Sequence, residues 1–142
     1  MDVLTIPFLG PLRATWQYPF ASLERNGATL AGGSDWAVST ANPLLEIEVA
    51  VNRVGDDRRG SEPFLPDERL SLESAVRAFT LGTAFVNHLE DICGSIEVGK
   101  MADLTVIDRD IFAPAAGPVG NARALATFVE GEPVFEDPAL GS

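Results

Sequence analysis

The sequence predicts an α/β chain that ends in a small antiparallel β region, and two patterns lead to this expectation. A short apolar run at residues 28–32 lies between helix-like segments at 19–25 and 43–53. Helix, buried strand, loop and helix in that order are typical of α/β organisation. A long amphipathic segment follows at 72–89, and beyond Gly94 the pattern changes to short β segments.

The first part of the chain is rich in proline and aromatic residues, and we expect residues 1–19 to form a loop. Pro19 suits the first turn of a helix. Asn26 and Gly27 are expected to end this helix, because both residue types tolerate a left-handed backbone conformation. The run at 28–32 is apolar without alternation. This pattern favours a strand buried on both faces, as in a parallel sheet.

Two further helices are indicated by apolar residues spaced three and four apart. The first covers about 43–53 and is followed at 55–69 by a solvated loop, whose mixed charges need no ligand to explain them. The second covers about 72–89, with Ser71 as its N-cap. Gly82 lies inside it at a cost of roughly 1 kcal/mol relative to alanine, so we expect close packing there against another backbone.

Short β segments are expected at 95–97, 103–108, 124–129 and 133–136. The turn at 130–132 between the last two is a hairpin signal. These strands are predicted to be antiparallel and sandwich-like, so the chain joins an α/β part to a small β part.

Composition excludes several classes of function. The 142 residues carry ten Lys+Arg and 21 Asp+Glu, a net charge of −11, so no basic face that binds nucleic acid is expected. His88 and Cys93 are the only residues of their types, which excludes a zinc site built from several histidines or cysteines and leaves no partner for a disulfide within the chain. A mean hydropathy of +0.12 is high for a small solvated domain and indicates apolar surface that a partner covers.

The sequence contains no signal for export or membrane insertion. The start lacks a basic region, Pro7, Gly10 and Pro11 interrupt any apolar stretch, and no apolar run reaches the ~18 residues of a membrane span. The single cysteine suits a reducing compartment. We therefore expect a cytoplasmic protein without a membrane partner.

Asp35 is the carboxylate whose position most suggests a chemical role. It follows the predicted buried strand, behind Gly32 and Gly33, and residues at the carboxyl ends of strands face the active site of an α/β barrel. The alternative is structural: Asp35 or Ser34 caps a helix or stabilises a turn, as these residue types often do after glycine. Spacing alone favours the structural role.

The other reactive residue types form no recognisable site. His88 lies near the end of a helix with no second metal ligand in sequence reach, and we expect a structural role. Cys93 lacks the partners of a catalytic nucleophile and is expected to be a small packed residue. Lys100 lies in a Gly-Lys turn without a phosphate-binding loop around it.

Two stretches of the chain match a known family pattern. Residues 33–38 read G-S-D-W-A-V, and residues 94–104 read G-S-I-E-V-G-K-M-A-D-L. They are similar to the G-S-D-x-P-V motif and the G-S-I-x-x-G-K-x-A-D-L stretch of the amidohydrolase superfamily, and most closely of its amidohydrolase-3 branch. Residues 9–13 and 50–53 fit the same pattern, whereas Ala37 replaces the usual proline of the first motif.

The resemblance implies a metal-dependent hydrolase of C–N bonds other than peptide bonds, acting on a small amide-type molecule. It implies a TIM barrel with a composite β-sandwich and a divalent metal site, with zinc as the expected ion, held by several histidines and a carboxylate or carbamylated lysine. Asp35 matches the aspartate after the eighth barrel strand, which in the family deprotonates the metal-bound water and passes the proton to the leaving group. The resemblance therefore makes Asp35 the predicted catalytic and metal-site residue.

The chain departs from the family in its length and in its ligands. The H-x-H pair of the first strand, the bridging residue and the later histidines are absent, and a TIM barrel needs ~200–250 residues. We therefore expect the C-terminal part of such an enzyme, starting after the seventh strand. Residues 1–90 would supply the last helix–strand–helix of the barrel, and residues 91–142 the C-terminal strands of the sandwich.

Two hypotheses follow. In the first, the chain is part of a hydrolase whose metal ligands lie on a missing N-terminal segment or a separate chain. In the second, it is a non-catalytic remnant or an oligomeric structural unit, and the chain alone binds no metal. Self-association or a missing N-terminal partner segment is expected, because the apolar faces at 28–32 and 72–89 would otherwise stay open.

Overall fold

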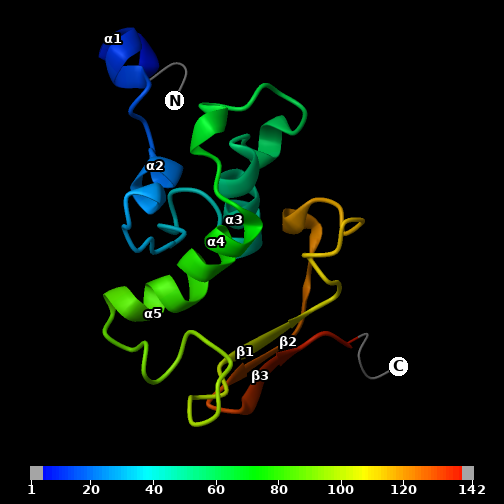
Figure 1. Ribbon diagram of the computed structural model, residues 1–142. Helices are drawn as coiled ribbons and strands as arrows, with labels where there is room; N and C mark the ends of the chain where they lie inside the picture. The colour runs from blue at the N-terminus through cyan, green and yellow to red at the C-terminus, as the bar shows by residue number, and fades with distance from the viewer. Residues whose placement is uncertain (1–4, 139–142) are drawn as a thin grey trace.

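The computed structural model describes residues 5–138, and its helices form one part of the molecule and its strands another (Figure 1). The α-helices are α1 (Ile6–Ala14), α2 (Phe20–Arg25), α3 (Pro43–Asn52), α4 (Leu72–Arg77) and α5 (Thr83–Val86). A π-helical turn, Ala78–Gly82, joins α4 to α5. Short 3₁₀ turns cover Asp56–Arg58, Pro66–Glu68 and Val119–Asn121. The strands are β1 (Leu104–Ile107), β2 (Ala124–Val129) and β3 (Glu132–Glu136).

The N-terminal segment contains helix α1, so the expectation of a loop over residues 1–19 is wrong. A proline lies in the first turn of α1, and the chain turns again at Pro11 after Gly10, whose φ of 73° breaks the helix in two. Proline stabilises first turns because its φ is already helical. No residue of α1 is buried, and the helix stands apart at one end of the helical part (Figure 1). Residues 1–4 of the expected loop lie outside the described residues.

Helices α2 and α3 form where they were predicted, and each is fixed by a local contact. The hydroxyl and the N–H of Ser22 donate to the carboxylate of Glu68, which ties α2 to the loop before α4 and lowers the pKa of Glu68. The side chain of Asn42 accepts a hydrogen bond from the N–H of Leu44 at 3.0 Å and caps α3. Arg53 ends α3 in the left-handed region, with a φ of 59°.

The helix predicted over 72–89 is present, although it contains the π turn and ends three residues earlier, at Val86. Ser71 caps it as expected, because its hydroxyl accepts the N–H of Ser74 at 3.0 Å. The apolar side of this helix packs on α3 to form the core. The buried members of the core are Ala21, Ile47, Leu70 and Ala75, surrounded by the partly buried Leu30, Leu44, Val76 and Phe79.

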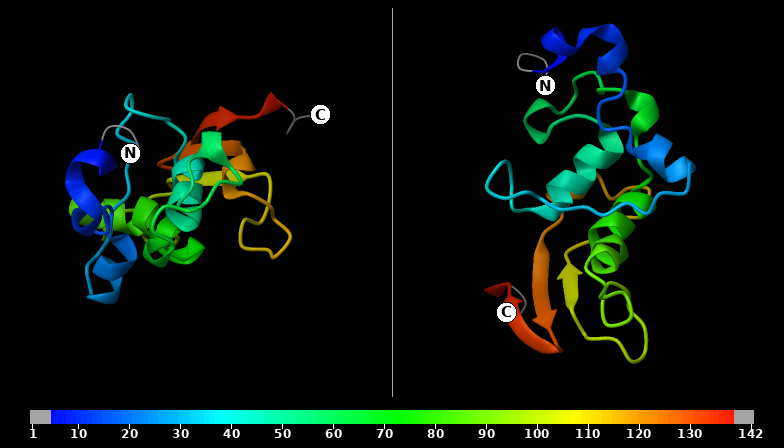
Figure 2. Two further views of the ribbon diagram at one scale, coloured as in Figure 1. Left: turned by 90° about the horizontal axis from the view of Figure 1, so that it is seen from above. Right: turned by 90° about the vertical axis from the view of Figure 1, so that its left-hand side faces the viewer.

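Two segments expected to be strands are not strands. Residues 28–32 form a long connection between α2 and α3 with no neighbouring strand in the described part of the chain (Figure 2). A parallel strand exists only beside other strands, and the apolar pattern reports the tendency to be buried, not the presence of partners. Residues 95–97 lie in the bends and turns that connect α5 to β1, so that prediction is wrong as well.

The three C-terminal strands form where they were predicted and make one antiparallel sheet in the order β1-β2-β3. Leu104 pairs with Phe128 across β1 and β2. The hairpin between β2 and β3 turns at Glu130 and Gly131, which have φ values of 53° and 84°. Two consecutive positive φ values are those of a type I′ turn. Within residues 5–138 this single sheet is not packed against a second one, so the sandwich-like arrangement is not present.

Much apolar surface is open to solvent. The chain exposes 9669 Å², about 2,600 Å² more than the roughly 7,100 Å² that a compact monomer of 15.1 kDa exposes. Large side chains contribute to it, among them Phe8 at 81%, Trp36 at 67% and Ile96 at 88% exposure. No helix within residues 5–138 combines the length and the apolar character that crossing a membrane requires.

Candidate functional site

The segment 28–34 leads to Asp35 and is held along the helix formed by α4 and α5. The N–H of Gly32 donates to the carbonyl oxygen of Ala78 at 2.9 Å. The hydroxyl of Thr83 lies 2.8 Å from the carbonyl oxygen of Gly32 and 3.0 Å from that of Ala78. The π turn therefore serves a purpose, because a carbonyl group inside the helix accepts a hydrogen bond from a neighbouring segment.

Two glycines allow this close approach. A Cβ atom on Gly82 would overlap the carbonyl oxygen of Leu30, and one on Gly32 would overlap the ring of Phe79. The backbone of the segment thus lies directly on the helix, with no side chain between them. The expectation that Gly82 marks close packing against another backbone is confirmed.

Exposure along this segment alternates with the period of a β-strand. Leu30, Gly32 and Ser34 are half-buried, whereas the residues between them are exposed. The backbone groups of Thr29, Leu30, Ala31 and Gly33 have no hydrogen-bond partner within residues 5–138. Backbone groups in folded proteins are almost always paired once they are buried, so this segment is open to pairing with another strand.

Asp35 lies at the end of the segment in a tight turn. Its φ is 49°, and its carbonyl oxygen accepts the N–H of Val38 at 2.8 Å. Ser34 makes the side-chain contribution to this turn, because its hydroxyl accepts the N–H of Trp36 at 3.3 Å. The carboxylate of Asp35 is exposed and has no hydrogen bond or ion pair to any residue in the described range. The turn thus uses the backbone of Asp35 and leaves its carboxylate available.

Asp35 is not grouped with other possible metal ligands in the described part of the chain. Within residues 5–138, no three side chains of His, Cys, Asp or Glu are grouped closely enough to hold one. A zinc site needs three or four such ligands, and a lone carboxylate does not supply them. Among the described residues, Asp35 therefore has no grouped side chains that would complete a metal site with it.

The remaining candidate residues are His88, Cys93 and Lys100, which lie far from Asp35 in the sequence. His88 is exposed just after α5, with a φ of 58°. Cys93 is a half-buried free thiol. The ammonium group of Lys100 lies 2.6 Å from the hydroxyl of Ser95 and forms an ion pair with Glu97, so it stabilises the turn that carries the second family-like motif.

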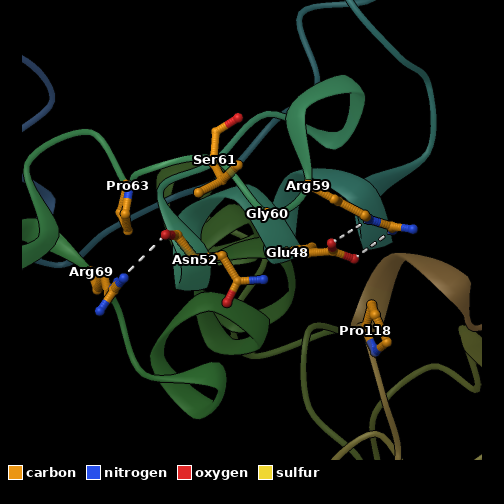
Figure 3. A pocket seen from close by; sticks show the side chains of 9 residues that line it. Glu48, Asn52, Arg59, Gly60, Ser61, Pro63, Arg69 and Pro118 are labelled. Carbon is orange, nitrogen blue, oxygen red and sulfur yellow. Dashed lines mark hydrogen bonds and ion pairs between the residues drawn. The ribbon is translucent and has the colours of Figure 1, made fainter.

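The structure also contains an ion pair that sequence reasoning missed. Glu48 is only 4% exposed, and its two carboxylate oxygens accept hydrogen bonds from Arg59 at 2.7 and 2.8 Å (Figure 3). The N–H of Gly120 donates to the same carboxylate at 2.8 Å, which joins α3 to the β part. The pair lines a cavity of about 350 Å³ to which Asp35 does not contribute. The sequence did contain an indication that Glu48 is buried. This residue lies on the apolar face of α3, next to Ile47 and four residues after Leu44.

Arg53 is a second buried charged residue. Its guanidinium group donates to the carbonyl oxygens of Phe64 at 2.9 Å, Tyr18 at 3.2 Å and Gln17 at 3.3 Å. Burial lowers its pKa, while Glu68 opposes this effect. Arg53 therefore fastens the residues that precede α2 to the end of α3.

Known proteins share the sequence pattern over most of this chain. A profile described as the amidohydrolase family matches residues 1–135. The protein LONG AFTER FAR-RED 3 of Arabidopsis thaliana is 35% identical over 128 residues, which cover 89% of this chain and 21% of that protein. The putative amidohydrolase YtcJ of Bacillus subtilis is 30% identical over 90% of this chain and 24% of its own length. The N-substituted formamide deformylase of Arthrobacter pascens is 32% identical over 80% of this chain and 20% of its own length.

A solved structure agrees with these relatives in fold. The crystal structure of an amidohydrolase from Thermotoga maritima aligns with a TM-score of 0.60 and 21% identity, covering 83% of this chain and 26% of that protein. The chain thus spans between a fifth and about a quarter of the proteins that it matches. From the profile match and the relatives together, the chain belongs to the amidohydrolase family.

Proposed function

We propose that this chain supplies the final part of a metal-dependent amidohydrolase that hydrolyses C–N bonds other than peptide bonds in a small amide-type molecule. Residues 1–90 form the last helix–strand–helix portion of its TIM barrel, and residues 91–142 contribute strands to its β-sandwich. The observation that carries the proposal is the free carboxylate of Asp35 at the end of a strand-like segment whose backbone groups are unpaired.

The alternation of exposure supports this assignment. In a barrel strand, one set of alternate residues faces the surrounding helices and the other set faces the barrel interior. Leu30 and Gly32 already face a helix here, so Thr29, Ala31 and Gly33 occupy the positions of interior residues. Asp35 continues this second set, at the end of the segment where a barrel carries its active site.

The surface left open to solvent supports the proposal that this chain is one part of a larger fold. The excess of about 2,600 Å² of accessible surface on this chain is about what one side of a large obligate interface buries. The relatives are four to five times longer than the matched region, so their remaining parts are long enough to supply the strands that segment 28–34 lacks.

In the completed enzyme, Asp35 handles a proton. Its carboxylate accepts a proton from the attacking water and returns it to the leaving nitrogen, which is general base and general acid catalysis by one group. The divalent metal expected from the family, with zinc as the first candidate, would be held chiefly by residues outside this chain. The absence of a group of three possible ligands within residues 5–138 supports this part of the proposal.

Fusion to the rest of a relative tests the proposal. The matching region of the Arthrobacter pascens N-substituted formamide deformylase is replaced by this chain, and hydrolysis of an N-substituted formamide is measured. Deformylation above that of the deformylase lacking this region supports a catalytic part. A chimera that folds and binds metal without turnover would instead identify the chain as a non-catalytic remnant or a structural unit.

A further inference from the structure

A second cavity lies beside the unpaired segment, on the same side of the molecule as the α4–α5 helix. Its volume is about 460 Å³. Its walls combine apolar side chains from the segment and the helix with charged side chains from the loop that follows α5. The residues that matter here are Leu30, Leu81, Phe85, Glu90, Glu97 and Lys100.

Glu90 is the unusual member of this lining. Its Oε2 atom is buried and has no hydrogen-bond partner within residues 5–138. A buried carboxylate oxygen without a donor is unfavourable, so a structure that retains one normally brings a donor to it. Glu90 lines the cavity, so a donor bound there would lie next to its carboxylate group.

The neighbouring lysine does not satisfy Glu90. The ammonium group of Lys100 contacts the backbone carbonyl of Glu90, the hydroxyl of Ser95 and, at 3.5 Å, the carboxylate of Glu97. An ammonium group has three hydrogens, and these three acceptors account for them. Arg77 also lines the cavity, but it is exposed on α4 and can remain in water.

The same cavity borders Thr29 and Leu30, whose backbone groups are unpaired. A polypeptide that pairs with this segment must therefore pass beside the cavity. Three carboxylates and two cations line the cavity, and Glu97 is paired with Lys100. The remaining acidic charge, in a chain of net charge −11, favours a cation on that polypeptide.

We propose that this cavity is a docking site for an arginine side chain of the polypeptide that pairs with residues 29–33 and completes the fold. The proposal rests on the function proposed above, because it takes the missing part of the enzyme as the partner. The apolar walls from Leu30, Leu81 and Phe85 cover the stem of the side chain. The guanidinium group then donates to the carboxylate of Glu90, for which its planar, forked geometry is suited.

The intact 142-residue chain allows a direct test. N-acetyl-L-arginine amide is titrated into the ¹⁵N-labelled chain, and the chemical shifts of residues 28–31 and 81–100 are followed. N-acetyl-L-citrulline amide, which has nearly the same shape without the charge, is the matched probe. We expect the arginine compound to bind at least tenfold more tightly than the citrulline compound, and Glu90→Gln to remove that difference. Glu132→Gln, an exposed glutamate on β3, should leave it within twofold.

Three results would overturn the proposal. They are equal binding of the two compounds, unchanged binding in Glu90→Gln, or a lower melting temperature of Glu90→Gln. A lower melting temperature would mean that the carboxylate of Glu90 already has a partner within this chain. Removing the charge of a buried carboxylate that has no partner does not destabilise the fold. None of these results bears on turnover by the chimera, so failure of this site can be distinguished from failure of the proposed function.

Discussion

The contact between Gly82 and Leu30 predicts a specific loss of stability. In Gly82→Ala, the added Cβ would overlap the carbonyl oxygen of Leu30 and lie 3.1 Å from its carbonyl carbon. The new Cβ is fixed to the backbone of the helix, and the atoms that it meets belong to the backbone of Leu30. Neither can turn aside as a side chain can, so segment 28–34 must move away from the helix. It then loses the hydrogen bond from Gly32 to Ala78 and that from Thr83 to Gly32.

The magnitude follows from these losses. Two hydrogen bonds at about 1 kcal/mol each and partial exposure of Leu30 at about 1 kcal/mol give a cost of about 3 kcal/mol. Alanine returns about 1 kcal/mol through its higher helix propensity. The free energy of unfolding should therefore fall by about 2 kcal/mol, which urea unfolding followed by circular dichroism measures.

The control is Gly33→Ala in the same segment, where a Cβ would have no neighbour within 4 Å. Its free energy of unfolding should stay within about 0.5 kcal/mol of the original chain. If Gly82→Ala is as stable as the original chain, or more stable, segment 28–34 does not lie on the helix as described. The position of Asp35 would then have no structural support.

Three further predictions concern charge and metal. Arg59→Ala should lower the free energy of unfolding by about 2 kcal/mol, because Glu48 then stays buried without its cation. Thermal unfolding measures this loss, and the double variant Arg59→Ala with Glu48→Gln should recover part of it. Hydrogen bonds from Arg109 hold the pKa of Asp108 well below its usual value, so this carboxylate stabilises the fold above about pH 4 and the contribution is lost as the pH falls. Acid unfolding of Asp108→Asn should accordingly show a shallower dependence on pH than that of the original chain. The isolated chain should hold no stoichiometric zinc by elemental analysis after dialysis, whereas one equivalent that disappears in Asp35→Ala would contradict the account.

Local signals in the sequence predicted local structure well. Ser71 and the spacing of apolar residues located the start of α4, and the turn at 130–132 located the β2–β3 hairpin, because the decisive contacts lie within a few residues. Gly82 indicated close packing because a glycine inside a helix is less stable than alanine and is retained where a side chain would not fit. The family of the chain was predicted from its two motifs and is confirmed by the profile and the relatives.

The features that were missed depend on distant or absent partners. The apolar run 28–32 has the composition of a buried strand, but the strands it would pair with are not in the described chain. The pairing of Glu48 with Arg59 and Gly120 joins three separate segments, and no spacing rule connects them. The unpartnered oxygen of Glu90 is likewise a consequence of packing, since nothing distinguishes this glutamate from the exposed ones in the sequence.

The most direct test of the central claim is the turnover of the deformylase chimera carrying Asp35→Asn. The amide keeps the size of the side chain but cannot accept and return a proton, so kcat should fall by about 10²- to 10⁴-fold while substrate binding is largely retained. Asp91→Asn, an exposed carboxylate in the loop after α5, should leave kcat unchanged and controls for general charge effects. An Asp35→Asn chimera that turns over as fast as its parent would remove Asp35 from the mechanism and contradict the account.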